Sequence, residues 1–467
     1  MTTPRIPHRR AIARRAATAA GLLLATACVS DRATAPAADV ADAEVPSVSA
    51  SIGTGVQEYV AGEVLVKFRA GASAASRAAL MRGANAEVAE RILTASMRGR
   101  GDNEGVHVLR TSAAVESAIA ALRGRADVEY AEPNWVYHHE AVSNDPYVTN
   151  GTLWGMTGTF GSGASNAWVR NTSCSNVVIG IIDEGYMYTH SDLAGNVGTN
   201  PDEIAGNGKD DDANGLVDDV YGWDFAGNNS SVFDGVGDDH GTHVAGTIGG
   251  RGGNATGVAG VCWDVKLMSA KFLGATGGTT ANAIKAVDYF TNLKNKGMNI
   301  VATNNSWGGG GFSQGLKDAI DRAGAAGILF VAAAGNSSAD IDATISYPAG
   351  YDSGNIISVA SITSTGALSS FSNYGLTRVD LGAPGSSITS TLPVSGGKRN
   401  SVTSGYGSYS GTSMATPHVT GAVAFYSARN PLATAAAIKS AILGAVTPTA
   451  SLAGKTVTGG RLNISGF

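Results

Sequence analysis

The stretch "YSGTSMATPHVTG", residues 409–421, places the hydroxyl of Ser413 at the start of an apolar run with helical character. A serine at a helix start usually caps the helix, because its oxygen accepts the unpaired amide protons of the first turn. The same position would also present the hydroxyl as a nucleophile. That interpretation requires a general base, a group that orients the base, and hydrogen-bond donors for an oxyanion.

Two other stretches contain candidate partners for this serine. Asp183 ends the apolar run "VVIGIID", where a carboxylate could simply form a turn, and His240 lies in "GDDHGTHVAGTIGG" at the start of a helix of small residues. His240 and His243 could share a zinc ion, but the Glu of the H-E-x-x-H pattern is missing between them. We therefore interpret His243 as a buried helix residue bonded to backbone, and His418 as structural.

The elements around these residues predict an α/β fold. Continuous apolar strands are expected at 176–183, 265–273, 299–306, 327–335 and 355–361, with amphipathic helices at 280–297 and 313–327. Such strands are typical of a doubly wound, mainly parallel sheet flanked by helices, in which ligands bind beyond the carboxyl ends of the strands. Asp183 lies at such a strand end.

Four stretches, "IGIIDEG", "DDHGTHVAG", "FVAAAGNSS" and "YSGTSMATPHV", together resemble the subtilisin-like serine proteases (subtilases), in the chain order Asp, His, Ser. The resemblance covers residues 140–467. It implies peptide hydrolysis through an acyl-enzyme, with Ser413 as nucleophile, His240 as general base and then acid, and Asp183 holding the imidazole. Asn336 would donate its side-chain amide to the oxyanion, beside the N–H of Ser413.

The resemblance also implies a site for an extended protein or peptide substrate. The segment "NNSWGGGG" matches the family's substrate-binding strand, which pairs with the substrate as an added β-strand. Because no acidic residue lies in these segments, an apolar or aromatic substrate side chain is favoured over a basic one. One departure from the family is Glu184, which follows Asp183 where Thr or Ser is usual. The residues expected to contact substrate are Ser306, Trp307, Gly308, Ala334, Gly335 and Ser346.

An acidic stretch before His240 predicts a calcium site. Residues 202–239 hold eleven Asp and Glu against one Lys. Alternate oxygen ligands followed by a glycine turn describe half of a calcium loop, although Tyr221 stands where an EF-hand has its last Glu. By family resemblance, a second calcium ion would join Asp192 and Asn254. The ligands expected for the first ion are Asp210, Asp212, Asn214, the Leu216 carbonyl, Asp218 and Asp219.

The N-terminal part of the chain predicts export and a separate small unit. Residues 1–28 combine arginines with a short apolar stretch, as in a signal peptide, and Cys28 could alternatively carry a lipid anchor. Residues 29–57 have the composition of a disordered linker. Residues 58–139 read as a small α+β, ferredoxin-like unit of β-α-β-α-β order, which resembles the inhibitory propeptide of the family.

Composition and cysteine count limit the kinds of partner the protein can bind and indicate the compartment in which it folds. The net charge of −5 argues against nucleic acid as a partner, and no later run of about twenty apolar residues predicts a membrane span. Cys174 and Cys262 each precede a predicted strand by three residues. Those strands are parallel neighbours by the resemblance, so the offsets favour a disulfide over two separate buried thiols.

Taken together, these patterns predict a secreted, calcium-stabilised endopeptidase made as a precursor that cuts itself between about His138 and Asp145. Two other functions share these features. A non-catalytic scaffold would bind peptides without cutting them, and a serine acyltransferase or peptide ligase would use the same triad.

Overall fold

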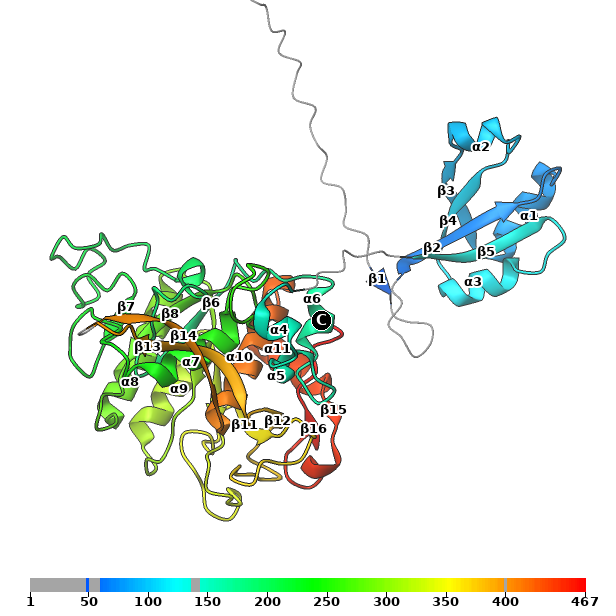
Figure 1. Ribbon diagram of the computed structural model, residues 1–467. Coiled ribbons are helices and arrows are strands. Elements are labelled where there is room, and N and C mark those ends of the chain that lie inside the picture. The colour runs from blue at the N-terminus through cyan, green and yellow to red at the C-terminus, as the bar shows by residue number, and fades with distance from the viewer. Residues whose placement is uncertain (1–47, 50–58, 136–142, 399–400) are drawn as a thin grey trace, which may run out of the picture. The chain divides into compact units, whose positions relative to one another are not determined.

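The computed structural model describes residues 48–49, 59–135, 143–398 and 401–467 and divides the chain into two compact units (Figure 1). Of the described residues, the first unit contains 48–49 and 59–134, and the second extends from residue 135 to the C-terminus. The predicted signal peptide with Cys28, all of the predicted linker except 48–49, and the expected processing region at 136–142 lie outside the described residues.

The N-terminal unit is a sheet with helices. Four of its strands follow the order β1-β2-β4-β3, and β5 pairs with β2. The predicted β-α-β-α-β order was wrong because it omitted strand β3 and the short helix α2. The segment "AEVAERI" of β3 is mostly exposed and lacks apolar alternation, so its sequence carries little strand signal. The elements are β1 (Val48–Ser49), β2 (Tyr59–Phe68), α1 (Ala74–Gly83), β3 (Ala86–Ile92), α2 (Ala95–Gly99), β4 (Val106–Thr111), α3 (Val115–Leu122) and β5 (Val128–Trp135).

The C-terminal unit contains a nine-stranded sheet of order β15-β16-β12-β11-β10-β9-β6-β8-β7. All neighbouring strands pair in parallel except β15 and β16, which confirms the predicted doubly wound fold. The strands are β6 (Val178–Asp183), β7 (Gly222–Asp224), β8 (Lys266–Lys271), β9 (Ile300–Asn305), β10 (Leu329–Ala333), β11 (Ile356–Ile362), β12 (Leu381–Pro384), β15 (Thr447–Pro448) and β16 (Gly460–Arg461).

Helices accompany this sheet, and a separate antiparallel hairpin packs on one of them. The hairpin consists of β13 (Ile388–Ser395) and β14 (Val402–Tyr409) and contacts α7. The helices are α4 (Pro146–Thr149), α5 (Trp154–Thr157), α6 (Ala164–Trp168), α7 (Asp239–Gly249), α8 (Thr280–Asn295), α9 (Gln314–Ala325), α10 (Thr412–Arg429) and α11 (Ala435–Gly444), with 3-10 turns at Ala194–Asn196 and Ala450–Leu452.

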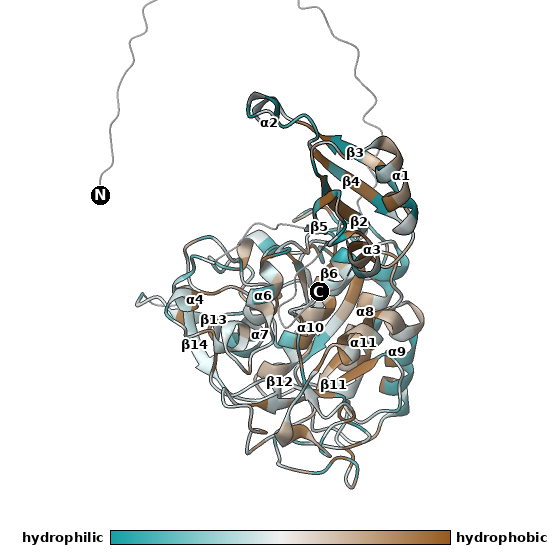
Figure 2. Ribbon diagram, turned by 90° about the vertical axis from the view of Figure 1, so that its right-hand side faces the viewer, coloured by the Kyte–Doolittle hydropathy of each residue, from teal (hydrophilic) through white to brown (hydrophobic). Residues whose placement is uncertain are grey.

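Apolar side chains fill both faces of the large sheet. Ile179 and Ile181 of β6 belong to the core cluster formed with α7 and α10, whereas Ile182 belongs to the cluster formed with α8 and α9. This alternation follows from the two-residue period of a strand and explains why strands such as β6 and β10 are apolar along most of their length. Figure 2 shows the hydrophobic colouring concentrated in these strands, with hydrophilic residues on α9.

The structure joins Cys174 to Cys262 by a disulfide, with the two α-carbons 5.8 Å apart. Both residues are fully buried. Val178 pairs with Lys266 in the parallel register of β6 and β8, so each cysteine lies four residues before its strand's first paired position. Equal offsets on parallel neighbours bring the two sulfur atoms together.

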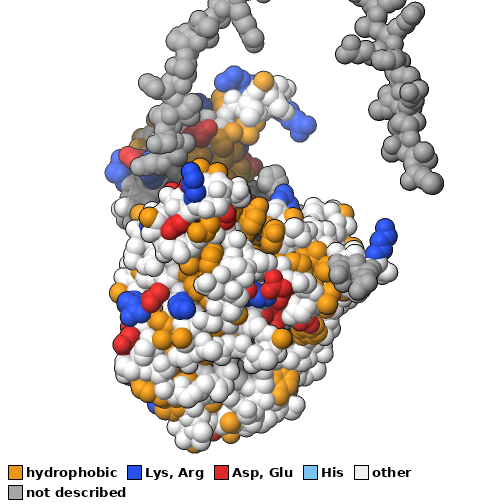
Figure 3. Space-filling model, turned by 90° about the vertical axis from the view of Figure 1, so that its left-hand side faces the viewer, with side chains coloured by type: hydrophobic (Ala, Val, Ile, Leu, Met, Phe, Trp, Pro, Cys, Tyr) orange, Lys and Arg blue, Asp and Glu red, His pale blue; other side chains and the backbone are white. Residues whose placement is uncertain are grey.

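The exposed surface is weakly charged. The face in Figure 3 is mostly uncharged, with scattered acidic and basic groups, as expected from a charged fraction of 15%. Within the described part of the chain, no helix combines the length and apolar character that a bilayer crossing requires.

Candidate active site

Asp183 and His240 form a hydrogen-bonded pair of a buried carboxylate and a partly exposed imidazole. Asp183 is the last residue of β6 and is fully buried, and His240 lies in the first turn of α7. The His240 Nδ1 lies 2.9 Å from Asp183 Oδ1 and 3.1 Å from Oδ2. A carboxylate on Nδ1 keeps the proton there, so that Nε2 is free to accept one.

The charges around His240 favour its protonated form. Burial by itself lowers the pKa of the imidazole, but the charge and hydrogen bond of Asp183, together with Glu184 and Asp239, outweigh burial and raise the pKa to about 9. The imidazole is therefore a stronger base than an unperturbed histidine, and it carries its proton up to a higher pH.

Ser413 is the second residue of α10, and it does not cap the helix. The N-cap residue is Gly411, and the Ser413 hydroxyl donates to the Ser306 carbonyl at 3.0 Å. In return, the Ser306 hydroxyl donates to the Ser413 carbonyl at 2.8 Å. That carbonyl is available because Pro417, four residues later, has no N–H to donate to it. Pro417 thus allows the helix start to be tied to the end of β9.

Asn336 lies where its amide can assist Ser413. Its Oδ1 accepts from the N–H of Thr412 at 2.8 Å and from the Thr412 hydroxyl at 3.0 Å, which leaves Nδ2 as the outward donor. A Cβ placed on Gly411 would lie 3.5 Å from both Asn336 Nδ2 and Ser413 N. Both nitrogen atoms therefore border the space beside Gly411.

The predicted substrate segment follows β9 directly. Ser306 is buried, and Trp307 packs edge-on against Phe272 with the ring centroids 4.8 Å apart. Beyond Gly308 the chain lies against Tyr347, to whose carbonyl Gly309 donates at 3.3 Å. The contacts with Phe272 and Tyr347 thus fix the position of this segment.

The remaining predicted substrate residues lie beside Asn336. A Cβ on Gly335 would lie 3.4 Å from the Ser346 hydroxyl, and Gly335 has a φ of +106°, which favours glycine. Ala334 is fully buried, and its N–H donates to the Val359 carbonyl at 3.0 Å. The structure therefore brings Gly335 and Ser346 together, while Ala334 belongs to the sheet.

His243 and His418 have structural contacts instead of a shared metal. His243 Nε2 lies 2.8 Å from the Ile388 carbonyl and its ring stacks on Tyr409. His418 Nδ1 lies 2.9 Å from the Met414 carbonyl. Burial lowers the pKa of each to about 4, so both imidazoles are neutral. Because His240 Nδ1 faces Asp183 and His243 Nε2 faces a backbone carbonyl, these contacts favour the structural interpretation of His243 over a zinc ion shared with His240.

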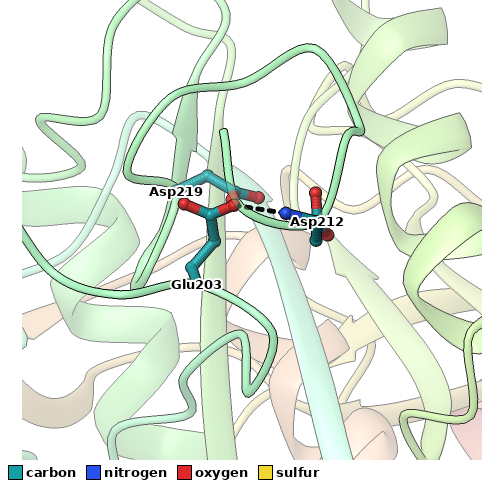
Figure 4. Close-up of side chains that lie close together, drawn as sticks. All are labelled: Glu203, Asp212 and Asp219. Atoms are coloured by element: carbon teal, nitrogen blue, oxygen red, sulfur yellow. Dashed lines mark hydrogen bonds between the residues drawn. The ribbon is translucent and has the colours of Figure 1, made fainter. Parts of the chain in front are cut away.

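The acidic loop brings together Glu203, Asp212 and Asp219, each with a carboxylate oxygen within 4.8 Å of the others (Figure 4). Asp212 and Asp219 were predicted, whereas Glu203 was missed because it lies outside the repeating Asp pattern. Asn214 donates to both aspartates at 3.1 Å, which ties it to the same cluster. Burial raises the pKa of Asp219, whereas for Asp212 burial is outweighed by hydrogen bonds from Lys296 and Asn200, which lower the pKa.

The other predicted ligands of this loop have different contacts. The Asp210 carboxylate accepts from the N–H groups of Asn214 and Gly215, and the Asp218 carboxylate from those of Asn207 and Gly208. The Leu216 N–H donates to Asn214 Oδ1. Asp210 and Asp218 therefore shape the loop through backbone contacts, outside the carboxylate cluster.

Asp192 and Asn254 are in contact, as the second calcium site would require. Asn254 Nδ2 donates to Asp192 Oδ1, and the N–H of Val258 donates to Asp192 Oδ2, both at 2.9 Å. Both carboxylate oxygens thus have N–H donors, and the geometry gives this site less support than the Glu203 cluster.

Comparison with known proteins identifies the family. The model of the subtilase family matches residues 174–461, which is most of the chain. The chain is a subtilase. The model of the fervidolysin N-terminal prodomain matches residues 46–134, so the match begins inside the stretch that composition assigned to a linker.

Named relatives of this subtilase are secreted or thermophilic proteases. It is 33% identical over 371 residues to a thermophilic serine proteinase of Bacillus sp. strain AK1, covering 78% of each chain. It is 34% identical over 335 residues to an extracellular protease of Xanthomonas campestris, covering 69% of this chain but 55% of the relative. A solved protease of Pseudoalteromonas arctica is 27% identical with a TM-score of 0.54, covering 69% of this chain and 96% of the other.

Proposed function

We propose that this subtilase is a secreted serine endopeptidase that is made as a precursor and processes itself. The observation that carries this proposal is the hydrogen bond between the buried Asp183 carboxylate and His240, at 2.9 Å. A buried carboxylate on Nδ1 is what a histidine needs to act as a general base for a serine hydroxyl. The extracellular proteases among the relatives support secretion.

In the proposed mechanism, an extended peptide pairs with the segment that starts at Ser306. The Ser413 hydroxyl turns from the Ser306 carbonyl toward Nε2 of His240, gives up its proton there and attacks the peptide carbonyl. Asn336 Nδ2 and the N–H of Ser413 stabilise the oxyanion. His240 then protonates the leaving amine, and water hydrolyses the acyl-enzyme by the same steps.

The N-terminal unit would serve as the inhibitory propeptide. Its match to a protease prodomain supports this role, and the predicted boundaries of 58–139 for the propeptide and 140–467 for the catalytic domain belong to the proposal. Removal of this unit by Ser413 would release the mature enzyme.

The proposed activity is tested with purified protein on casein. We expect peptide release that is abolished by a serine-directed sulfonyl fluoride, and mass spectrometry should locate the adduct on the peptide that contains Ser413. Unlabelled Ser413 in a protein that still hydrolyses casein would contradict the assignment. Transfer to an added amine in place of water would favour the ligase alternative.

We also propose that calcium binds at Glu203, Asp212 and Asp219. Glu203 is 8% exposed, and among the described residues its Oε2 has no hydrogen-bond partner. Buried carboxylates that converge without enough donors repel one another, and a hard divalent cation with oxygen ligands would relieve this repulsion. The ion would stabilise the loop between β6 and β7.

Removal of this ion should lower the thermal stability of the mature enzyme. At a calcium concentration about 100-fold above Kd, binding adds about 2.7 kcal/mol, equivalent to about 4 °C in Tm for a unit of this size. We expect a chelator to lower Tm by this amount and Glu203→Ala to remove most of the calcium-dependent rise. Asp211→Asn, in the same loop but outside the cluster, serves as the control and should retain it. Equal calcium responses in the two variants would contradict the site.

A further inference from the structure

The helix that carries His240 is not capped by its own N-cap residue. Asp238 occupies the N-cap position of α7 but makes no side-chain cap hydrogen bond. Its carboxylate instead binds Lys271 Nζ at 2.6 Å and the N–H of Asp234 at 2.6 Å. The first turn of α7 therefore needs an acceptor from another part of the chain, because its N–H groups have no partners within the helix.

Glu184 supplies that acceptor. Its Oε1 accepts from the backbone N–H of His240 at 2.6 Å. Its own N–H donates to Asp183 Oδ1 at 2.8 Å, the oxygen that also binds His240 Nδ1. Glu184 thus contacts both members of the Asp183–His240 pair: its side chain contacts His240, and its backbone contacts Asp183.

We propose that Glu184 is a positioning residue for His240: its carboxylate fixes the first turn of α7 and places a second negative charge beside the imidazole. The inference rests on the proposed protease function, since it concerns the general base of that reaction. A threonine or serine at this position would not supply such a charge. The carboxylate therefore contributes an electrostatic effect in addition to the cap.

The charged groups around Glu184 determine which neighbour its negative charge affects most. Asp183 precedes Glu184 in the chain, and Asp239 and His240 face it from α7. Tyr409 of β14 donates a hydrogen bond to Asp239, and the negative charge of Glu184 contributes to raising the pKa of Tyr409. The nearby cation, Lys271, is already paired with Asp234 and Asp238. His240 is therefore the group that most benefits from a negative charge on Glu184.

The expected titration follows from these neighbours. Burial, and then the charge of Asp183, raises the pKa of Glu184 to about 7. Above that pH the ionised carboxylate favours the imidazolium form of His240 and so raises its pKa. Because the general base must be neutral to accept the serine proton, Glu184 should move the acidic limb of kcat/KM to higher pH.

Glu184→Gln tests the charge while retaining an oxygen acceptor for the His240 N–H. The acidic limb of kcat/KM should move to lower pH by about 0.5–1 unit, so that activity on the acidic side of the limb rises about 3- to 10-fold. The variant Glu184→Ala also loses the cap, and its Tm should fall by about 1–3 °C. Asp318→Asn, which removes an exposed carboxylate on α9, should change neither quantity.

A direct titration separates this inference from the protease proposal. The pKa of His240 can be followed by NMR in the mature enzyme and in Glu184→Gln, with the resonance assigned from a His240→Ala variant, whether or not the protein hydrolyses casein. The His240 pKa should fall in the Gln variant. An unchanged pKa would overturn the inference even in an active enzyme, and a lowered pKa in an inactive protein would overturn only the protease proposal.

Discussion

The variant Ser413→Ala is expected to remain at precursor length and to lose casein hydrolysis by a factor on the order of 10⁶. The Ser413 hydroxyl supplies the attacking oxygen, and no neighbouring group can replace it. Its hydrogen bonds to the Ser306 segment also include one made by its own carbonyl, which alanine retains at 2.8 Å. The fold of α10 should therefore survive the substitution.

Ser408→Ala provides the matched control for this experiment. Ser408 is exposed on β14, five residues before Ser413, and its replacement should leave both processing and hydrolysis unchanged. Intact mass reports processing, and a melting curve shows that both variants fold. Loss of the N-terminal unit from Ser413→Ala, in a preparation free of other proteases, would remove Ser413 from the proposed role.

A second large loss of activity is expected when Asn336 is replaced. The variant Asn336→Asp keeps an oxygen that accepts from Thr412, at present 2.8 Å from its N–H, but replaces the outward amide donor with a carboxylate oxygen. Removing one oxyanion donor costs about 10²–10³ in kcat, a magnitude measured on a subtilisin, and the added negative charge should increase the loss. The substrate KM should change little, because the donor acts on the charge that develops in the transition state.

Initial-rate kinetics on a peptide substrate separate these two parameters for Asn336→Asp. The Tm should stay close to that of the wild type, because the contact with Thr412 is retained. A kcat within about fivefold of the wild type would show that Asn336 Nδ2 does not contact the oxyanion. A raised KM with an unchanged kcat would assign Asn336 to substrate binding.

Much of the large unit could be predicted from its sequence because its central strands are unusually apolar. A strand buried on both faces, such as β6 or β10, is apolar along most of its length and so differs from loops and amphipathic helices. The hairpin of β13 and β14 was not predicted. Its residues, "ITSTLPVS" and "VTSGYGSY", are small and polar, and the packing against α7 that fixes them is a long-range contact.

Long-range contacts also limited the prediction of the calcium cluster and of the contacts around His240. The spacing of Asp210, Asp212 and Asn214 predicted one calcium loop, but Asp210 turns toward backbone amides and Glu203 takes its place in the cluster. Local spacing does not encode the turn that brings Glu203 back to Asp212. Likewise, the sequence marked Glu184 as unusual, while its contact with the N–H of His240 depends on how α7 meets the end of β6.

The disulfide has a consequence for a protease that is exposed to its own activity. Cys174 and Cys262 bracket a segment that contains Asp183, the acidic loop and His240. Several loop residues in this segment are exposed, including Ile204 at 64%. If this loop were cut once by another copy of the enzyme, both fragments would stay covalently joined, each still holding its own half of the Asp183–His240 pair. The cross-link would thus keep the two fragments together after a single cut in this loop, so that the pair could stay assembled.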